Sequence, residues 1–223
     1  MRLVYFPVPG RAEASRVALS LSGLKWDDVE VNGDEYQKMK SEGSLPWGML
    51  PVLITNNGTI AESSAILRFI GEKSDLIPEN AYSRAKVNEF LDGMWPLAIA
   101  LNSTFGIEDQ QKRIALRKEL FKPEGEATKC MLQFEEKLQK SSTGWISGSN
   151  NMSIADLKLF TEFFGLFSGN YDGISSEMLK GYNILLKYHD KVSNEPRILK
   201  HYSKVNKENI RWTFLPGAFD HIR

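Results

Sequence analysis

The sequence predicts an α+β domain followed by an all-α domain. Up to Tyr82, short runs typical of strands alternate with helical patterns, whereas the β signals largely vanish after it. Between the two parts lies the stretch Leu76-Ile77-Pro78-Glu79-Asn80, where the proline closes the preceding helix and no periodicity continues. We therefore divide the chain into a domain at 1–75, a linker at 76–82, an all-α domain at 83–205 and a tail at 206–223.

The first domain is expected to have the order β-α-β and then β-β-α. Its expected elements are strands at 3–6 and 26–31, a helix at 12–22, an irregular or helical stretch at 34–41, strands at 52–55 and 59–61, and a helix at 64–73. Asn57-Gly58 is the pair that supplies the positive φ angles of a tight hairpin turn. Two such halves form a small four-stranded mixed sheet with helices on its faces.

The second domain is expected to contain helices alone. Helical patterns cover 85–105, with a kink at Pro96, and 114–140, with a break near Pro123. Ser153 and Asp156 form the pattern of a capping box that begins a further helix. The last helical patterns cover 178–192 and 197–205, and the tail has no clear assignment.

Composition excludes several classes of protein. The chain has 223 residues, and its 28 Lys and Arg balance 28 Asp and Glu, which argues against a nucleic-acid or membrane-surface protein. No apolar run reaches the roughly 18 residues that a membrane span needs. The single cysteine, Cys130, excludes an internal disulfide, and a strand directly after Met1 argues against a signal peptide. We expect a cytoplasmic protein and assign no residue to a metal.

The segment from Leu50 to Ser63 is the strongest indication of a binding site. Pro51 restricts Leu50 to an extended backbone and is either a strand-entry device or a cis-proline. In both cases the Leu50 backbone can pair with a peptide-like ligand. The helix that follows can offer free N–H groups to a carboxylate beside Ser63. The alternative is that Ser63 simply caps its own helix.

Five segments form a combination that is more specific than any one of them. They are Tyr5-Phe6 with Gly10-Arg11-Ala12-Glu13, Leu45 to Leu53, Glu62 to Ile66, Trp145 to Gly148, and Ser153 to Asp156. Together they resemble the cytosolic glutathione transferases of the tyrosine type, most closely the sigma class that includes glutathione-dependent prostaglandin D synthases. The resemblance spans about residues 2–205. The resemblance implies a thioredoxin-like first domain and glutathione as co-substrate.

By this resemblance, Tyr5 would donate its phenolic hydrogen to the glutathione sulfur. Arg11 would lie near the tyrosine hydroxyl, where a positive charge favours thiolate or phenolate. The alternatives are an ordinary strand tyrosine and a solvated arginine at a helix start. Arg16, at mid-helix, is expected to pair with a carboxylate instead. No cysteine lies near Tyr5, and Ser15 is inside a helix, which disfavours cysteine-type and serine-type mechanisms.

The glutathione contacts are also carried over from the resemblance, residue by residue. Glu62 and Ser63 would hold the γ-glutamyl end, and Asp92 would reach the glutathione of the neighbouring subunit in a homodimer. Met49 and Glu62 stand where the sigma pattern often has lysine and glutamine. The remaining expected contacts are Tyr36 and Lys40, for the glycine carboxylate, the Leu50 backbone, for the cysteinyl unit, and the neighbouring glutathione contacts Gly48, Met49 and Pro51. The alternatives are an exposed charged helix for Tyr36 and Lys40, and a surface aspartate for Asp92.

The expected partners are glutathione and a hydrophobic electrophile. The electrophile pocket would be bounded by the turn Val8-Pro9-Gly10 and by Trp95, Leu97 and the tail around Trp212 and Phe214. The leading hypothesis is a glutathione transferase. The alternatives are a glutathione-dependent prostaglandin or lipid isomerase and a non-catalytic ligand carrier or crystallin. The sequence does not identify the electrophile.

Overall fold

The computed structural model describes residues 1–223, apart from the side chain of Trp95. Four short strands of the first domain form one sheet with the order β2-β1-β3-β4. β1 is parallel to β2, and β3 is antiparallel to both β1 and β4. The elements are β1 (Arg2–Tyr5), α1 (Glu13–Ser22), β2 (Asp27–Glu30), α2 (Gly33–Ser41), β3 (Val52–Thr55), β4 (Gly58–Ala61) and α3 (Ser63–Gly71). The predicted mixed sheet and element order are confirmed.

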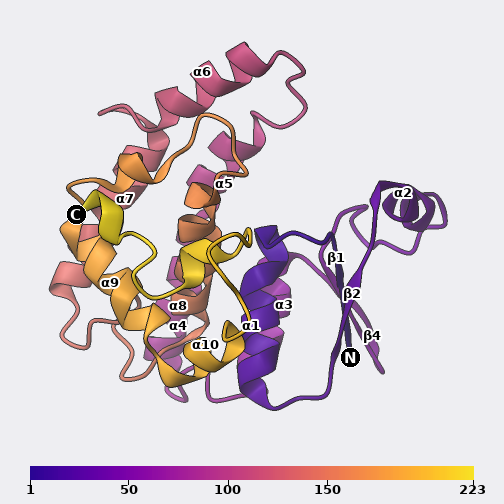
Figure 1. Cartoon of the computed structure of the whole chain (residues 1–223). Helices are drawn as coiled ribbons and strands as arrows, with labels where there is room; N and C mark the ends of the chain where they lie inside the picture. Colours follow the sequence, from indigo (N-terminus) through magenta and orange to yellow (C-terminus); the bar gives the residue numbers. More distant parts are fainter.

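The sheet packs against the second domain through two helices. Leu3 and Leu53 are register partners at its centre, and both are fully buried. Figure 1 shows α1 and α3 between the sheet and the helical domain, while α2 lies on the far side. α1 packs against α3 and also against α8 and α10 of the second domain. α2 has no buried residue, because most of its surface faces solvent.

The hairpin between β3 and β4 differs from the expectation. Its turn residues are Asn56 and Asn57, and the return strand begins at Gly58. Gly58 has a φ of 127°, and Glu62 is the one non-glycine residue with positive φ among those that the structure describes. The prediction that Asn57 adopts positive φ is therefore wrong, because Gly58, which lacks a Cβ, alone takes the left-handed conformation.

The second domain consists of helices, as predicted, with shifted boundaries. They are α4 (Ala81–Gly93), α5 (Trp95–Asn102), α6 (Gln110–Leu120), α7 (Glu126–Lys140), α8 (Ile154–Lys158), α9 (Asn183–Ser193) and α10 (Pro196–His201). α4 begins before residue 85 because the Asn80 side chain accepts the Ser83 N–H and caps it. Pro96 lies in the first turn of α5, where proline is tolerated, so it follows a break and not a kink. Of the described residues, none forms a helix long and apolar enough to cross a membrane.

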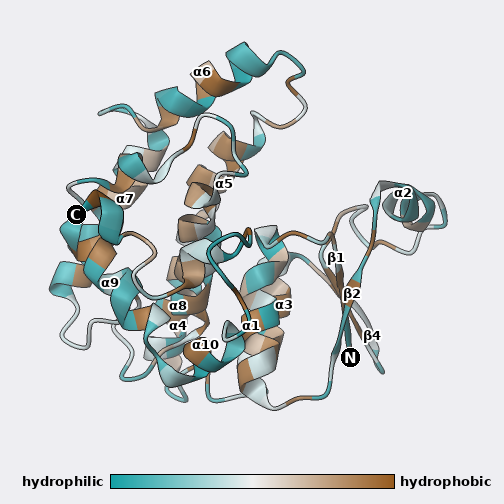
Figure 2. Cartoon of the chain, in the orientation of Figure 1, coloured by the Kyte–Doolittle hydropathy of each residue, from teal (hydrophilic) through white to brown (hydrophobic). Residues whose placement is uncertain are grey.

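Aromatic side chains fill the core of the helical domain. α8 continues into a π-helical turn, Leu159–Phe163, and a 3₁₀ turn, Phe164–Ser168. Figure 2 shows that α5 and α8 in the middle of this domain are mostly hydrophobic, whereas α6 at its edge is mostly hydrophilic. The largest fully buried side chains here are phenylalanines, and two of them come from the tail: Phe160, Phe163, Phe164, Phe167, Phe214 and Phe219.

A buried carboxylate joins the end of the chain to its first helix. Glu13 is fully buried at the start of α1. It accepts a hydrogen bond from the Tyr202 hydroxyl at 3.1 Å and pairs with Arg211 Nε at 2.9 Å. Arg16 lies 3.4 Å from the same carboxylate and 2.8 Å from Asp28, which confirms that Arg16 pairs with carboxylates. A buried charge is stable only when it is paired in this way.

Candidate active site

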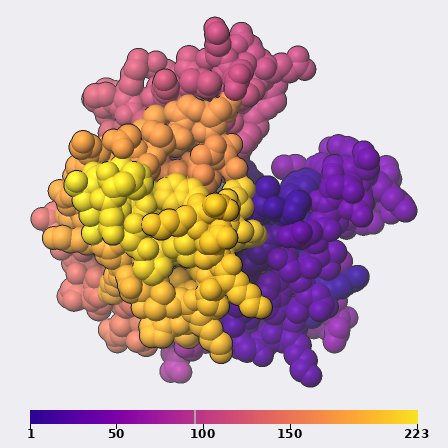
Figure 3. Space-filling model, viewed as in Figure 1, coloured from indigo at the N-terminus to yellow at the C-terminus, as the bar shows by residue number. Residues whose placement is uncertain are grey.

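Two adjoining cavities lie where the two domains meet. The larger, of about 400 Å³, lies between the first residues of the chain and the helical domain. The smaller, of about 230 Å³, is lined by Leu50, Pro51, Glu62 and Ser63 and their neighbours. Arg11 and Asn102 line both, so the two cavities share a border. Figure 3 shows a notch between the helical domain and the N-terminal domain, with the start of the chain at its base.

Tyr5 stands at the end of β1 and lines the larger cavity. Its hydroxyl oxygen accepts the backbone N–H of Arg11 at 3.3 Å, which leaves the hydroxyl hydrogen available for another acceptor. Burial raises the pKa of Tyr5 above its ordinary value, and this effect outweighs the lowering by the Arg11 N–H and the Arg11 charge. Arg11 therefore favours the phenolate, as expected, but burial outweighs it, and Tyr5 remains a neutral phenol with a hydrogen to donate.

The turn between Tyr5 and α1 is closely fitted around the hydroxyl. Gly10 has a φ of 44°, and a Cβ at this position would lie 2.7 Å from the Tyr5 hydroxyl oxygen. Arg16 holds the preceding backbone by donating to the carbonyl oxygens of Phe6 at 3.1 Å and Val8 at 2.8 Å. The hydrogen bonds from Arg16 thus fix the backbone of the turn, and the absence of a side chain at Gly10 leaves room for the Tyr5 hydroxyl.

The smaller cavity combines the Leu50 backbone with the start of α3. The Leu50–Pro51 peptide is cis, and both residues are buried. Ser63 is the first residue of α3. Glu62 holds the N-cap position with a φ of 69°, and its side chain makes no capping hydrogen bond. The alternative that Ser63 is the N-cap of its own helix is therefore not what the structure shows.

The expected glycine-end residues are not brought into the smaller cavity as a group. The Tyr36 hydroxyl donates to the Gly48 carbonyl oxygen at 2.9 Å, so it supports the segment before Leu50. Lys40 is exposed on α2. Neither Tyr36 nor Lys40 lines the smaller cavity. Met49 does line it, and 51% of the Met49 surface is exposed.

Asp92 lies on α4, outside both cavities of this chain. Its carboxylate is exposed and forms an ion pair with Arg68 of α3. The role expected for it concerns a second subunit and stays a prediction.

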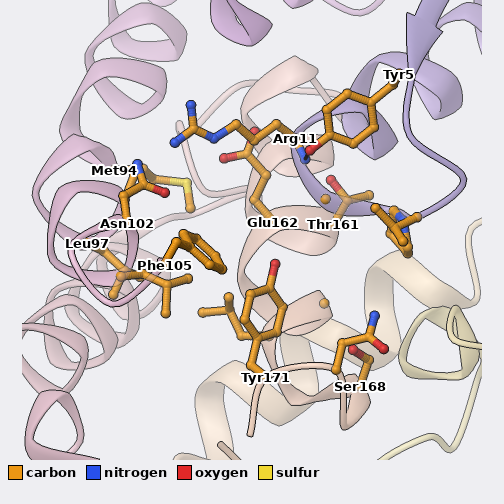
Figure 4. A pocket seen from close by; sticks show the side chains of 18 residues that line it. Tyr5, Arg11, Met94, Leu97, Asn102, Phe105, Thr161, Glu162, Ser168 and Tyr171 are labelled. Atoms are coloured by element: carbon orange, nitrogen blue, oxygen red, sulfur yellow. Dashed lines mark hydrogen bonds between the residues drawn. The ribbon is translucent and has the colours of Figure 1, made fainter. Parts of the chain in front are cut away.

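Several lining residues of the larger cavity were not found from the sequence. Thr161 and Glu162 come from the π-helical turn, and Tyr171 comes from the loop after the 3₁₀ turn. Figure 4 shows these side chains around the same space as Tyr5 and Arg11. Lys158 donates to Glu162 at 2.9 Å and to Ser64 of α3 at 3.2 Å, which ties this turn to the first domain. The sequence signal was slight: two polar residues, Thr161 and Glu162, inside a phenylalanine-rich stretch.

The tail does not form the wall that was expected of it. Phe214 is fully buried and packs against Phe160 at 5.5 Å between ring centroids. Trp212 donates its indole N–H to the Ser168 carbonyl oxygen at 3.0 Å. Neither residue lines the larger cavity, because the tail packs into the apolar core of the helical domain instead. Leu97 does line it, and the side chain of Trp95 lies outside the described residues.

The single cysteine is remote from this chemistry. Cys130 is buried in α7, and burial raises the pKa of its thiol to about 11. A buried, protonated thiol is a poor nucleophile.

Comparison with known proteins gives consistent matches over both domains. The family model described as "Glutathione S-transferase, N-terminal domain" matches residues 1–72, and the one described as "Glutathione S-transferase, C-terminal domain" matches residues 100–205. The chain is 28% identical over 209 residues to a glutathione S-transferase of Plasmodium yoelii yoelii, covering 90% of this chain and 91% of that protein. It is 25% identical to human glutathione S-transferase A3, covering 89% and 86%. A prostaglandin synthase D of Nilaparvata lugens shares the fold, with a TM-score of 0.78, 21% identity, and 91% and 96% of the two chains covered.

Proposed function

Because this chain belongs to the glutathione S-transferase family, we propose that its smaller cavity holds glutathione and that Tyr5 activates the glutathione thiol. The protein is a glutathione transferase, with glutathione as its co-substrate. The observation that carries the assignment of Tyr5 is the hydrogen bond from the Arg11 N–H, because it orients the neutral phenol with its own hydrogen free. Arg11 adds a positive charge at the border of the two cavities.

The smaller cavity offers complementary groups to a γ-glutamyl peptide. The first N–H groups of α3 and the Ser63 hydroxyl suit the γ-glutamyl carboxylate. The Glu62 carboxylate suits the ammonium group of the same residue. The Leu50 backbone would pair with the cysteinyl unit, which directs the sulfur toward Tyr5. Tyr36 would act by fixing Gly48, and Lys40 would reach the glycine carboxylate from outside.

The energy required of Tyr5 is within reach of one hydrogen bond. A thiol with a pKa of about 8.5 is mostly protonated at neutral pH, and lowering that pKa by about two units takes roughly 2.7 kcal/mol. A hydrogen bond to a charged group contributes about 1.5–3 kcal/mol. The thiolate then attacks a hydrophobic electrophile in the larger cavity.

The test is retention on immobilised glutathione followed by conjugation of a chlorodinitrobenzene. We expect Tyr5→Phe to be retained as the wild type is and to turn over at least about tenfold more slowly, equivalent to about 1.4 kcal/mol. Tyr82→Phe is the matched control, because Tyr82 is 76% exposed on α4 and lines neither cavity. Failure of the wild type to bind glutathione refutes the proposal. Binding without conjugation favours the carrier or crystallin alternative.

Placement in the sigma class and isomerisation of a prostaglandin are finer proposals. They are supported by the motif Tyr5-Phe6 with Gly10-Arg11-Ala12-Glu13 and by the fold shared with a prostaglandin synthase. Incubation with a prostaglandin endoperoxide and glutathione distinguishes an isomerase from a transferase. An isomerase yields an isomer and leaves the glutathione unconsumed, whereas a transferase yields a conjugate.

We also propose a cytoplasmic homodimer in which Asp92 reaches the glutathione of the partner subunit. Dimerisation is typical of the family, and the exposed carboxylate of Asp92 is accessible to a second chain. Sedimentation gives the oligomeric state. In a dimer, Asp92→Asn is expected to raise the KM for glutathione with the sedimentation coefficient unchanged.

A further inference from the structure

The turn between Tyr5 and α1 is held by one buried guanidinium group. Arg16, which is 3% exposed, donates from Nη1 to the Val8 carbonyl oxygen at 2.8 Å and from Nη2 to the Phe6 carbonyl oxygen at 3.1 Å. The same turn carries the Arg11 N–H that bonds to the Tyr5 hydroxyl. A displacement of the Arg16 guanidinium would therefore move the group that orients this hydroxyl.

A buried carboxylate competes for the Arg16 guanidinium. Glu13 lies three residues before Arg16 on α1 and is fully buried. Arg16 Nη1 is 3.4 Å from Glu13 Oε2, which is a longer and weaker contact than the one it makes with the Val8 carbonyl oxygen. A carboxylate attracts a guanidinium more strongly than a neutral carbonyl group does. Glu13 would therefore draw Arg16 away from the turn unless another cation met its charge.

The tail supplies this second cation. Arg211 Nε lies 2.9 Å from Glu13 Oε1, and the Tyr202 hydroxyl donates to the same oxygen at 3.1 Å. Figure 1 shows the tail, in yellow, passing beside α1. Arg211 lies beyond residues 100–205, which match the family model. The charge of Glu13 is thus met at Oε2 by an arginine of α1 and at Oε1 by an arginine of the tail.

The second domain holds Arg211 in place. Its backbone N–H donates to Asn209 Oδ1 at 2.9 Å, and the indole N–H of the next residue, Trp212, donates to the Ser168 carbonyl oxygen at 3.0 Å. Only 20% of the Arg211 side chain is exposed, so water screens its ion pair weakly. Arg211 therefore reaches from a fixed point on the helical domain to the first helix of the other domain.

We propose that Arg211 is a positioning residue for Tyr5, because its pairing with Glu13 leaves Arg16 on the carbonyl groups of the turn. The inference rests on the proposed function, in which Tyr5 activates the glutathione thiol. Without Arg211, the Glu13 carboxylate keeps only Arg16 of the two arginines. Arg16 then moves toward Glu13 Oε2, the turn loosens, and the Tyr5 hydroxyl is less well aimed at the sulfur.

The test measures the apparent pKa of the glutathione thiol bound to the full-length protein, from thiolate absorbance. We expect Arg211→Met to raise this pKa by about 0.5–1 unit, which corresponds to an acid about three- to tenfold weaker. The kcat for chlorodinitrobenzene at pH 6, where the thiol is mostly protonated, should fall by a similar factor. The KM for glutathione should stay within about twofold, because Arg211, Glu13 and Arg16 do not line the smaller cavity.

Two controls separate positioning from the loss of an ion pair. Arg197→Met removes an arginine that pairs with Glu195 at 3.0 Å and with Asp75 at 2.9 Å and that lines neither cavity. It should leave the thiol pKa unchanged. Arg211→Lys keeps a cation beside Glu13 and should restore most of the wild-type thiol pKa.

A double-mutant cycle tests the route through the carboxylate. Glu13→Gln removes the charge that competes for Arg16. In this background, the further change Arg211→Met should move the thiol pKa by less than about 0.3 unit. A rise as large as in the wild-type background would show that Arg211 does not act through Glu13, and it would overturn the proposal.

The remaining outcomes are equally decisive. An unchanged thiol pKa in a folded Arg211→Met protein overturns the role of Arg211. If that variant does not fold, Tyr202→Phe removes the other donor to Glu13 Oε1 and keeps an aromatic ring in place. It should raise the thiol pKa by a smaller amount, and no rise there also overturns the proposal. A wild type that binds no glutathione refutes the proposed function itself, whereas a wild type with a lowered thiol pKa and an unaffected Arg211→Met variant refutes only the role of Arg211.

Discussion

Replacing Gly10 by alanine tests the fit between the first turn and Tyr5. The added Cβ would lie 2.7 Å from the Tyr5 hydroxyl oxygen and 3.1 Å from ring atom Cε1. Favourable contacts between such atoms begin at about 3.5 Å, so the hydroxyl must move by roughly half an ångström or more. The left-handed conformation at 44° adds about 1–2 kcal/mol for a residue with a Cβ.

The structure offers a control that separates these two effects. Gly23, at the end of α1, has a φ of 70° and nothing within 4 Å of an added Cβ. We expect Gly23→Ala to lose the same 1–2 kcal/mol of unfolding free energy with normal turnover. Gly10→Ala should lose at least as much stability and also slow conjugation by about tenfold or more, because displacement of the hydroxyl weakens its bond to the sulfur.

Two measurements are required: denaturant unfolding for stability, and the apparent pKa of bound glutathione from thiolate absorbance. The pKa should rise in Gly10→Ala alone. The double variant Gly10→Ala with Tyr5→Phe has no hydroxyl for the added Cβ to clash with. Its loss of unfolding free energy should therefore be smaller than the sum of the losses in the two single variants. Wild-type turnover in Gly10→Ala would refute the reasoning.

Three further predictions concern the supports of the site. Tyr36→Phe removes the hydrogen bond to Gly48 and should raise the KM for glutathione several-fold with little change in kcat, measured by steady-state kinetics. Arg211→Met removes one partner of the buried Glu13 and should lower the unfolding free energy by about 1–3 kcal/mol in denaturant titration, since other partners remain. Cys130 should resist alkylation at pH 8 in the native protein and react fully once unfolded. Because its pKa of about 11 is raised in the folded state, its contribution to stability should be lost as the pH rises from 9 to 11.

The sequence was most informative where local chemistry determines local structure. The capping pattern of Ser153 and Asp156 is present, with the Asp156 carboxylate accepting the Ser153 N–H at 2.8 Å. The strand Leu3-Val4-Tyr5 and the turn at Gly10 likewise follow from residue type, since β-branched and aromatic residues suit a buried strand and glycine permits positive φ.

What the sequence could not give depends on contacts between distant residues. Tyr171 lies in a loop rich in Gly, Asn and Ser, and its place in the cavity depends on the pairing of Asp172 with two arginines of α6, which no periodicity reveals. The tail was misassigned for the same reason. The apolar side chain of Phe214 would suit a pocket wall as well as a hydrophobic core. Only its burial beside Phe160 shows that it belongs to the core.

The pairing of Glu13 with groups near the end of the chain bears on the order of synthesis. A domain made first on the ribosome can begin to fold before the rest of the chain exists. Here, however, two of the groups that hold the Glu13 carboxylate, the Tyr202 hydroxyl and Arg211, lie near the end of the sequence and are translated late. The Glu13 carboxylate at the start of α1 therefore gains these two partners only after nearly the whole polypeptide has emerged. Nascent chains, and any product of premature termination before Arg211, would carry a carboxylate at the domain junction without its full set of partners.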